Sequence, residues 1–350
     1  MADELAGRKL DALVVTAPPN IRYLCGFTGS HGLLVVPAAG EPVLYTDPRY
    51  EIQAGEEARC TVKVTKKSLI EAAARDMSRR RSWRRIGFEA GSMRYADYAA
   101  LRHALPSARS LEPQTDLVEK LRLVKSPAEV ETIRRSMAIA AEAYRRVVGS
   151  LRPPVRETEV AAELDHQMRQ LGAEKPAFET IVLFGERAAL PHGKPGPRAL
   201  SMGDLVLVDL GAVLDGYTSD MTRMAVAGKP TERLRRLYQL VLEAQRAALE
   251  QLRPGVAASA VDRAARRSLE RHGLADCFVH STGHGVGLEI HEAPRLGKRE
   301  KVRLKAGMVV TIEPGIYVEG WGGLRVEDTV VVTSNGYDIL TPLGKELTVL

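Results

Sequence analysis

One segment decides how the second half of this 350-residue chain folds: Asp204–Arg223, with the sequence DLVLVDLGAVLDGYTSDMTR. It predicts a β-hairpin, because two strand-like runs flank a short Asp-Gly turn. The hairpin would bring Asp209 and Asp220 close together, although ten residues separate them. The alternative, an exposed pair of acids, is disfavoured because apolar residues surround Asp209. Two carboxylates that converge in such a setting repel each other unless a cation lies between them, so the segment predicts a metal site.

Three histidines lie in one glycine-rich segment, His280–Glu292, with the sequence HSTGHGVGLEIHE. A single histidine of this kind is more often a buried core residue than a ligand. Three of them, His280, His284 and His291, occur here among glycines that allow the backbone to approach a ligand closely. His192 lies in a loop with the sequence LPHGKP, whose prolines and glycine are typical of a rigid turn that lines a site.

Two further acids lie on predicted strands near the end of the chain. Glu313 ends an apolar strand, and Glu327 lies in the middle of another predicted strand, over 323–332. Strand alternation puts Arg325 and Glu327 on one face, so a structural ion pair between them is an alternative interpretation. That pair would leave the other candidates unexplained. We therefore predict one ligand set for two divalent cations: Asp209, Asp220, His284, Glu313 and Glu327.

The length of the chain favours two domains, each with its own core. The first 118 residues alternate short strands with helices, which predicts an α/β domain over 1–118. Residues 119–126 are expected to be a linker and helix start, because Ser126 can cap a helix, Pro127 suits its first position and Glu129 completes a capping box. A second domain is expected over 127–350, with two helix pairs that suggest a duplicated architecture.

Composition and charge exclude several classes of function. The net charge of +6 and the arginine-rich run 79–85 could suit nucleic acid, but 44 acids are mixed among 50 bases, and an exposed helix face explains the run. The longest apolar runs are too short to cross a membrane, and the N-terminus has no secretory signal, so we expect a cytoplasmic protein with neither nucleic-acid nor membrane partner. Three cysteines at unrelated spacings indicate neither a disulfide framework nor a zinc cluster.

These motifs resemble the M24 metallopeptidases, the family of methionine aminopeptidase, aminopeptidase P and prolidase, which have the pita-bread fold. The resemblance covers essentially the whole chain. It implies an α/β creatinase-like N-terminal domain followed by an α+β pita-bread catalytic domain. The LPHGKP loop, His280 and the N-terminal domain resemble the branch that acts on Xaa-Pro peptides.

The resemblance also implies roles for the site residues. Asp209 would chelate one metal, His284 and Glu313 would complete the other, and Asp220 and Glu327 would bridge the two. Glu313 would in addition carry a proton to the leaving nitrogen. The remaining roles are substrate contacts and support: His192 and His291 as donors to the substrate and the tetrahedral intermediate, His280 as a wall for the proline ring, Tyr217 and Arg295 in substrate binding, and Arg325 as the residue that orients the acids.

A site with one nitrogen and otherwise oxygen donors suits manganese or cobalt better than thiolate-loving metals. We therefore expect two divalent ions, with Mn²⁺ first and Co²⁺, Fe²⁺ or Zn²⁺ as alternatives. Such ions make water a nucleophile near neutral pH. A homodimer is expected from the resemblance.

The expected activity is that of an Xaa-Pro aminopeptidase of the aminopeptidase P type, favoured by the N-terminal stretches Tyr23–Ser30 and Leu44–Tyr50. The alternative is an Xaa-Pro dipeptidase, or prolidase, because Arg295 matches an arginine that binds a dipeptide's free carboxylate in some prolidases. A remote alternative is a peptidase-like binding module without catalysis, which the complete ligand set disfavours.

Overall fold

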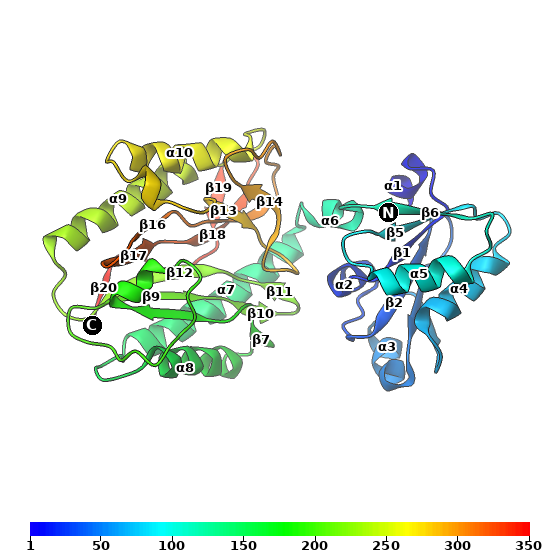
Figure 1. Cartoon of the computed structure of the whole chain (residues 1–350), viewed down its shortest axis with the longest axis horizontal. Helices are drawn as coiled ribbons and strands as arrows, with labels where there is room; N and C mark the ends of the chain where they lie inside the picture. Colours follow the sequence, from blue (N-terminus) through cyan, green and yellow to red (C-terminus); the bar gives the residue numbers. More distant parts are fainter. The chain divides into compact units, whose positions relative to one another are not determined.

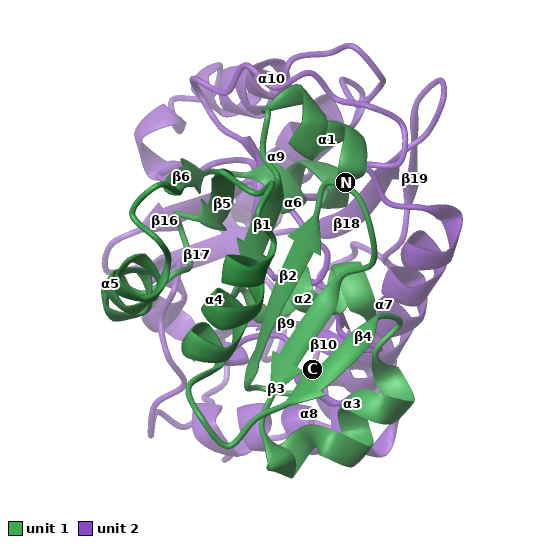
Figure 2. Cartoon of the chain, turned by 90° about the vertical axis from the view of Figure 1, so that its right-hand side faces the viewer, with its two compact units in different colours: residues 1–122 green, residues 123–350 purple.

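The chain consists of two compact units in the computed structural model, which describes residues 1–350: Met1–Arg122 and Leu123–Leu350 (Figure 2). The division falls inside the segment 119–126 that the sequence predicts as a linker. None of the helices is both long and apolar enough to span a membrane.

A six-stranded sheet with the strand order β4-β3-β2-β1-β5-β6 forms the centre of unit 1 (Figure 1). Its strands are β1 Ala12–Val15, β2 Gly32–Pro37, β3 Val43–Thr46, β4 Thr61–Val64, β5 Arg85–Glu89 and β6 Ser110–Gln114. Its helices are α1 Ala2–Gly7, α2 Pro18–Cys25, α3 Glu51–Glu57, α4 Leu69–Arg79, α5 Tyr95–Ala104 and α6 Leu117–Arg122. This is the expected α/β domain.

Both faces of that sheet are covered by helices, as the burial of β1 shows. Successive side chains of a strand point to opposite faces. Ala12 and Val14 belong to one apolar core, with residues of α4 and α5. Leu13 and Val15 belong to a second core, with residues of α1, α2, α3 and α6. The sheet therefore separates two cores, as in other layered α/β domains.

Two helix pairs organise unit 2. They are α7 Pro127–Val148 with α8 Glu157–Gln170, and α9 Glu232–Leu249 with α10 Ala258–Glu270. The predicted start of α7 is confirmed: Ser126 accepts from the backbone of Glu129, and the Glu129 side chain accepts from the backbone of Ser126. Pro127 occupies the first helical position, where its missing N–H costs nothing.

Each helix pair packs against its own sheet. The first sheet has the order β20-β12-β9-β8, and the second has the order β14-β13-β15-β18-β19. A pair β16-β17 and a small sheet β11-β10-β7 complete the unit. The strands are β7 Lys175–Pro176, β8 Ile181–Phe184, β9 Leu205–Leu210, β10 Ala212–Leu214, β11 Tyr217–Thr218, β12 Met221–Val226, β13 Gly283–Gly285, β14 Glu292–Leu296, β15 Val309–Ile312, β16 Gly315–Val318, β17 Gly322–Arg325, β18 Asp328–Val332, β19 Tyr337–Ile339 and β20 Thr348–Val349.

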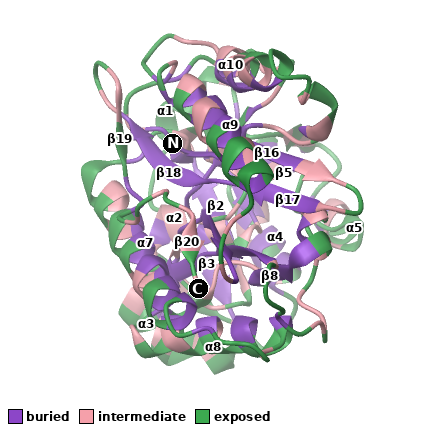
Figure 3. Cartoon of the chain, turned by 90° about the vertical axis from the view of Figure 1, so that its left-hand side faces the viewer, coloured by how far each residue is buried: buried purple, intermediate pink, exposed green.

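Unit 2 has two main apolar cores. One core joins α7 and α8 to one face of β8, β9 and β12, and the other joins α9 and α10 to β15, β17 and β18 and to the opposite face of β8, β9 and β12. In Figure 3, α9 shows exposed and buried residues, whereas β17 and β18 are buried. This arrangement of a helix pair and a sheet, repeated once, is the predicted α+β fold of the second domain.

Candidate metal centre and active site

The first two candidate ligands lie on neighbouring antiparallel strands. Asp209 near the end of β9 is paired with Thr222 of β12, and Asp220 directly precedes β12. Asp220 and Thr222 are two residues apart and so face the same side. The predicted pairing of the two strands is thus confirmed. The turn between them is longer than a simple hairpin, because β10 and β11 pair with each other there.

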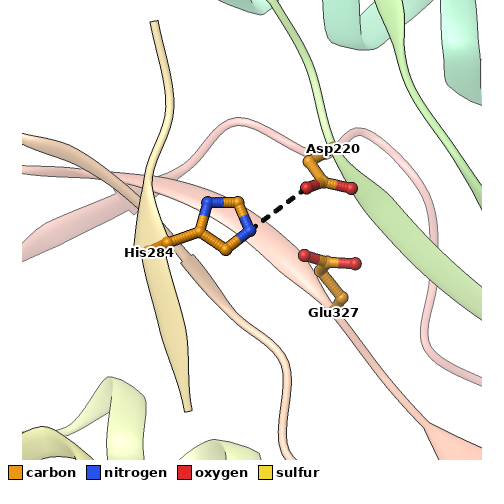
Figure 4. A group of neighbouring side chains, drawn as sticks. All are labelled: Asp220, His284 and Glu327. Carbon is orange, nitrogen blue, oxygen red and sulfur yellow. Dashed lines mark ion pairs between the residues drawn. The ribbon is translucent and has the colours of Figure 1, made fainter. Parts of the chain in front are cut away.

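Three candidates form a compact group: Asp220, His284 and Glu327 each place one ligand atom within 4.8 Å of the others (Figure 4). Nε2 of His284 lies 3.4 Å from Oδ2 of Asp220 and 3.5 Å from Oε1 of Glu313. Nδ1 of His284 lies 3.0 Å from the carbonyl of Gly285, to which it can donate. That hydrogen bond leaves the lone pair of Nε2 directed toward the carboxylates, as metal coordination requires.

Close backbone contacts explain the glycine before His284. A Cβ atom at Gly283 would overlap the carbonyl oxygen of Thr311 on the neighbouring strand β15. The backbone N–H of His284 donates to Oγ1 of Thr311 at 3.1 Å, and that hydroxyl lies 3.3 Å from Oε1 of Glu313. A larger residue at position 283 would therefore move His284 away from Glu313.

The position of Glu327 differs from the prediction. The sequence pattern predicts it in the middle of a strand, whereas the structure places it between β17 and β18, which belong to different sheets. The backbone N–H of Glu327 donates to the carbonyl of Thr222 at 3.2 Å, and its Oε2 accepts from the hydroxyl of Thr222 at 2.7 Å. The chain crosses from one sheet to the other at this residue, which is why strand pairing is interrupted there.

The electrostatics of the group fit divalent cations. Burial raises the pKa of Asp220 well above its ordinary value, and the charges of Asp209 and Glu313 raise it further. The pKa of Glu327 is likewise raised well above its ordinary value, by burial and then by the charge of Asp220. Oδ1 of Asp209 is buried without a hydrogen-bond partner. Buried carboxylates without compensation are costly, and cations held among them would offset that cost.

Arg325 connects the acids to a wider hydrogen-bond network. Its Nη2 donates to Oδ2 of Asp209 at 2.6 Å, and its Nε donates to Oγ1 of Thr222 at 2.9 Å. Its Nη1 donates to the carbonyl of Pro191 at 3.0 Å and to the hydroxyl of Tyr317 at 2.8 Å. The contact with Pro191 fixes the loop that carries His192, so one guanidinium orients both a candidate ligand and a candidate substrate residue.

Tyr317 and Thr222 are part of this network, and the sequence analysis did not single them out. Burial raises the pKa of Tyr317 to about 12, so its hydroxyl stays protonated at neutral pH. That hydroxyl lies 2.9 Å from Nε2 of His280. Thr222 could have been found from its spacing, two residues after Asp220 at the start of β12. Tyr317 lies on β16, which pairs with the strand β17 that carries Arg325, so only that pairing brings it to the site.

All five candidate ligands line one cavity of about 240 Å³. His192, His291 and Arg325 line it as well. Partial burial of the ring, together with the charge of nearby His284, lowers the pKa of His291 below its ordinary value. Six further residues complete the lining: Phe178, Glu179, Ile181, Gly193, Lys194 and Ile290.

Three candidate substrate residues lie outside that lining. His280 reaches the site through the hydroxyl of Tyr317. Arg295 is an exposed residue of β14. The hydroxyl of Tyr217 donates to Oε1 of Glu129 in the first turn of α7, at 2.7 Å. The substrate-binding roles of these three residues stay predictions.

Comparison with known protein families identifies the fold that holds this site. The family model of metallopeptidase family M24 matches residues 131–334, and that of the creatinase/prolidase N-terminal domain matches residues 1–124. The chain belongs to metallopeptidase family M24.

Its M24 relatives span the same length. The Xaa-Pro dipeptidase of Pyrococcus furiosus is 38% identical over 339 residues, which cover 97% of this chain and 95% of that protein. The structure of an Xaa-Pro dipeptidase from Bacillus anthracis has a TM-score of 0.95 and 36% identity, covering 100% of this chain and 99% of that one. An X-Pro aminopeptidase from Thermotoga maritima MSB8 has a TM-score of 0.93 and 34% identity, with the same coverage. This M24 chain is therefore a metallopeptidase of the Xaa-Pro type, with the two-domain pita-bread architecture.

Proposed function

We propose that this chain hydrolyses the peptide bond that precedes proline in Xaa-Pro substrates, with two Mn²⁺ ions bound. One observation carries the proposal: four carboxylates and His284 converge on a single cavity that His192 and His291 also line. In this proposal the metals are held by Asp209, Asp220, His284, Glu313 and Glu327. When bound, such ions supply Lewis acidity for activating water and polarising the substrate carbonyl.

The protein's own groups would manage protons and hold the substrate. Glu313 lies beside His284 and within 3.3 Å of the Thr311 hydroxyl, so its carboxylate is placed to accept a proton and return it to the leaving nitrogen. His192 and His291 would donate hydrogen bonds to the substrate carbonyl and to the negative charge that develops on its oxygen. Arg325 would keep Asp209 and the His192 loop in place.

The choice of manganese rests on the chemistry of the donors. Four carboxylates and one imidazole favour hard or borderline ions over ions that prefer thiolates, and Co²⁺, Fe²⁺ and Zn²⁺ are the alternatives. Protein stripped with EDTA and reloaded with each ion should regain Xaa-Pro hydrolysis with two ions bound per chain, most strongly with Mn²⁺. Full activity in the stripped protein would contradict the metal dependence and the proposed ligand set, although not the Xaa-Pro activity itself.

We place the Xaa-Pro dipeptidase first and the aminopeptidase P type second. Two of the relatives described above are named Xaa-Pro dipeptidases. The aminopeptidase P type is favoured by the N-terminal motifs and by the likeness to the X-Pro aminopeptidase structure. Initial rates on Ala-Pro and on Ala-Pro-Ala would decide between them.

Arg295 provides a matched pair of variants for that experiment. If Arg295 binds the free carboxylate of a dipeptide, R295Q should raise KM for Ala-Pro by about 10-fold and leave Ala-Pro-Ala nearly unchanged. R299Q, an exposed arginine four residues further on, is the control. A dipeptide preference that survives in R295Q would remove Arg295 from the binding site while leaving the dipeptidase activity in place.

The homodimer and the cytoplasmic location also stay proposals. The dimer rests on the family resemblance, and light scattering of the metal-loaded chain would test it. A peptidase-like binding module would show no metal-dependent hydrolysis in the experiments above, and a nucleic-acid binder would show salt-dependent retention on DNA.

A further inference from the structure

Two side chains of α10 hold the segment that leads into β13. The carboxylate of Asp262 is buried, and its Oδ1 accepts from the backbone N–H of Thr282 at 3.1 Å and from its hydroxyl at 3.0 Å. Its Oδ2 accepts from Nε of Arg266 at 2.8 Å. Arg266 is therefore oriented by an acid one turn earlier on its own helix.

The guanidinium of Arg266 binds the backbone on both sides of Val279. Nη1 donates to the carbonyl of Phe278 at 2.9 Å, and Nη2 donates to the carbonyl of His280. The same guanidinium lies over the ring of Phe278, with its carbon 4.3 Å from the ring centroid. Three contacts from one rigid group thus fix the backbone at 278–280.

This fixed backbone determines where the ring of His280 lies. The ring of Phe278 meets it edge to face, with centroids 5.1 Å apart. Nδ1 of His280 donates to the carbonyl of Ser281 at 2.8 Å, which leaves Nε2 to accept from the hydroxyl of Tyr317 at 2.9 Å. Both ring nitrogens are engaged, so any contact between His280 and a substrate would be made by the carbon atoms of its ring.

Arg266 itself does not line the cavity, so it can affect substrate binding only through another residue. We propose that Arg266, oriented by Asp262, is a positioning residue that holds the His280 ring in place for recognition of the substrate's proline ring. This inference rests on the proposed function of His280 as part of the proline pocket. It assigns no metal-binding role to α10.

The test compares R266Q with R267Q in the metal-loaded full-length chain. Arg267 is the next residue on α10, is exposed and serves as the control. R266Q should lower kcat/KM for Ala-Pro by about 10-fold or more, mainly by raising KM, as changes in supporting groups around a site commonly do. R267Q should behave like the wild type. R266K, which keeps the charge but not the forked donors, should give an intermediate KM.

A double-mutant cycle with His280 distinguishes an effect of Arg266 on the position of His280 from a general loss of structure. If Arg266 acts through His280, R266Q should change kcat/KM by less than about 2-fold in an H280A background, because the two effects are not additive. Calorimetric titration with Mn²⁺ should give the same stoichiometry and affinity for R266Q and the wild type. Additive losses, a changed Mn²⁺ affinity, or an R266Q variant with wild-type KM would each overturn the proposal. A wild-type chain that cleaves neither Ala-Pro nor Ala-Pro-Ala would instead contradict the proposed activity, and an H280A variant with unchanged KM would contradict the proposed role of His280.

Discussion

Arg325 donates a hydrogen bond from Nη2 to Oδ2 of Asp209 at 2.6 Å, and both side chains are largely buried. The other oxygen of Asp209, Oδ1, is buried without a partner. One carboxylate oxygen is thus anchored by the protein, and the other is available for a cation. This asymmetry is what a metal ligand needs, because an acid that is fully satisfied by the protein has no lone pair to give.

Replacing Arg325 by lysine tests whether its geometry matters beyond its charge. Lysine keeps the positive charge but cannot reach Asp209, Thr222, Pro191 and Tyr317 together, as the guanidinium does. We expect R325K to weaken Mn²⁺ binding by about 10-fold or more and to lower kcat/KM by about 100-fold. Calorimetry and steady-state kinetics on Ala-Pro measure the two effects. Wild-type values for both would show that a positive charge near Asp209 is sufficient.

Replacing Asp220 by asparagine should change stability in opposite directions with and without metal. Burial and the neighbouring acids raise the pKa of Asp220, so its ionised form is unfavourable in the metal-free protein. D220N removes a buried, uncompensated charge and should therefore raise the free energy of unfolding in EDTA by about 1 kcal/mol or more. With excess Mn²⁺ the wild type should become the more stable protein, because binding to the native state stabilises it.

Thermal unfolding in EDTA and in Mn²⁺ checks both halves of this prediction. S219A, at the residue before Asp220, removes a buried hydroxyl that accepts hydrogen bonds from the backbone N–H of Ala212 and from Ser136. It changes no charge, so it should lose the same stability in EDTA and in Mn²⁺ and serves as a control for local disturbance. A D220N variant that is less stable than the wild type in EDTA would show that Asp220 contributes to the fold by itself. A D220N variant that gains as much stability from Mn²⁺ as the wild type would remove Asp220 from the ligand set.

The sequence predicts those parts of the structure whose cause is local. The start of α7 follows from Ser126, Pro127 and Glu129, and the structure has the capping box that these residues can form. The pairing of β9 with β12 follows from two apolar strands on either side of a turn. The four acidic candidate ligands could be named because acids in apolar strands are unusual, and His284 because it lies with two other histidines in a glycine-rich segment. All five line one cavity.

The parts that the sequence did not predict depend on contacts between distant segments. The short helix α2 begins after Ala17 without a side-chain cap, and only the prolines at its start and Gly26 after its end mark it locally. Its buried residues Ile21 and Cys25 belong to the apolar core on one face of the sheet. Glu327 interrupts a run that reads as one strand, because the chain changes sheets there. Tyr317 joins Arg325 to His280 across three separate elements. Contacts between residues that are far apart in the sequence cannot be predicted from a local sequence pattern.

His192 and His291 are expected to contribute to catalysis without holding metal. Replacing either histidine by alanine should lower kcat/KM by about 100-fold to 1000-fold, because loss of a hydrogen-bond donor to a developing negative charge has effects of this size. The Mn²⁺ stoichiometry of H192A and H291A should stay at the wild-type value. H272A, at an exposed histidine beyond the end of α10, is the control. Loss of a bound ion in H291A would make that residue a ligand instead.

The ion pair between Asp76 and Lys63 in unit 1 leads to a prediction about how the stability of the fold depends on pH. Nζ of Lys63 lies 2.6 Å from Oδ2 of Asp76, and the hydroxyl of Tyr45 donates to the same oxygen at 3.0 Å. Burial alone would raise the pKa of Asp76, but these two hydrogen bonds and the charges of Lys63 and Arg79 together outweigh it and lower the pKa below its ordinary value of 3.8. A carboxylate with a lowered pKa stabilises the folded state above its unfolded pKa, and this contribution is lost as the pH falls toward the folded pKa.

The change that tests this is D76N, which removes the titrating group and keeps its size. Because Lys63 is about half exposed, we expect the wild type to exceed D76N in unfolding free energy by only about 1 kcal/mol at pH 7. That difference should shrink below about pH 4. In a W321F background Trp83 is the one remaining tryptophan, so its fluorescence in urea follows the unfolding of unit 1. D97N, whose partner Arg94 is largely exposed, is the control. A difference between the wild type and D76N that stays constant from pH 7 to pH 3 would mean that Asp76 stabilises unit 1 by packing and not by its charge.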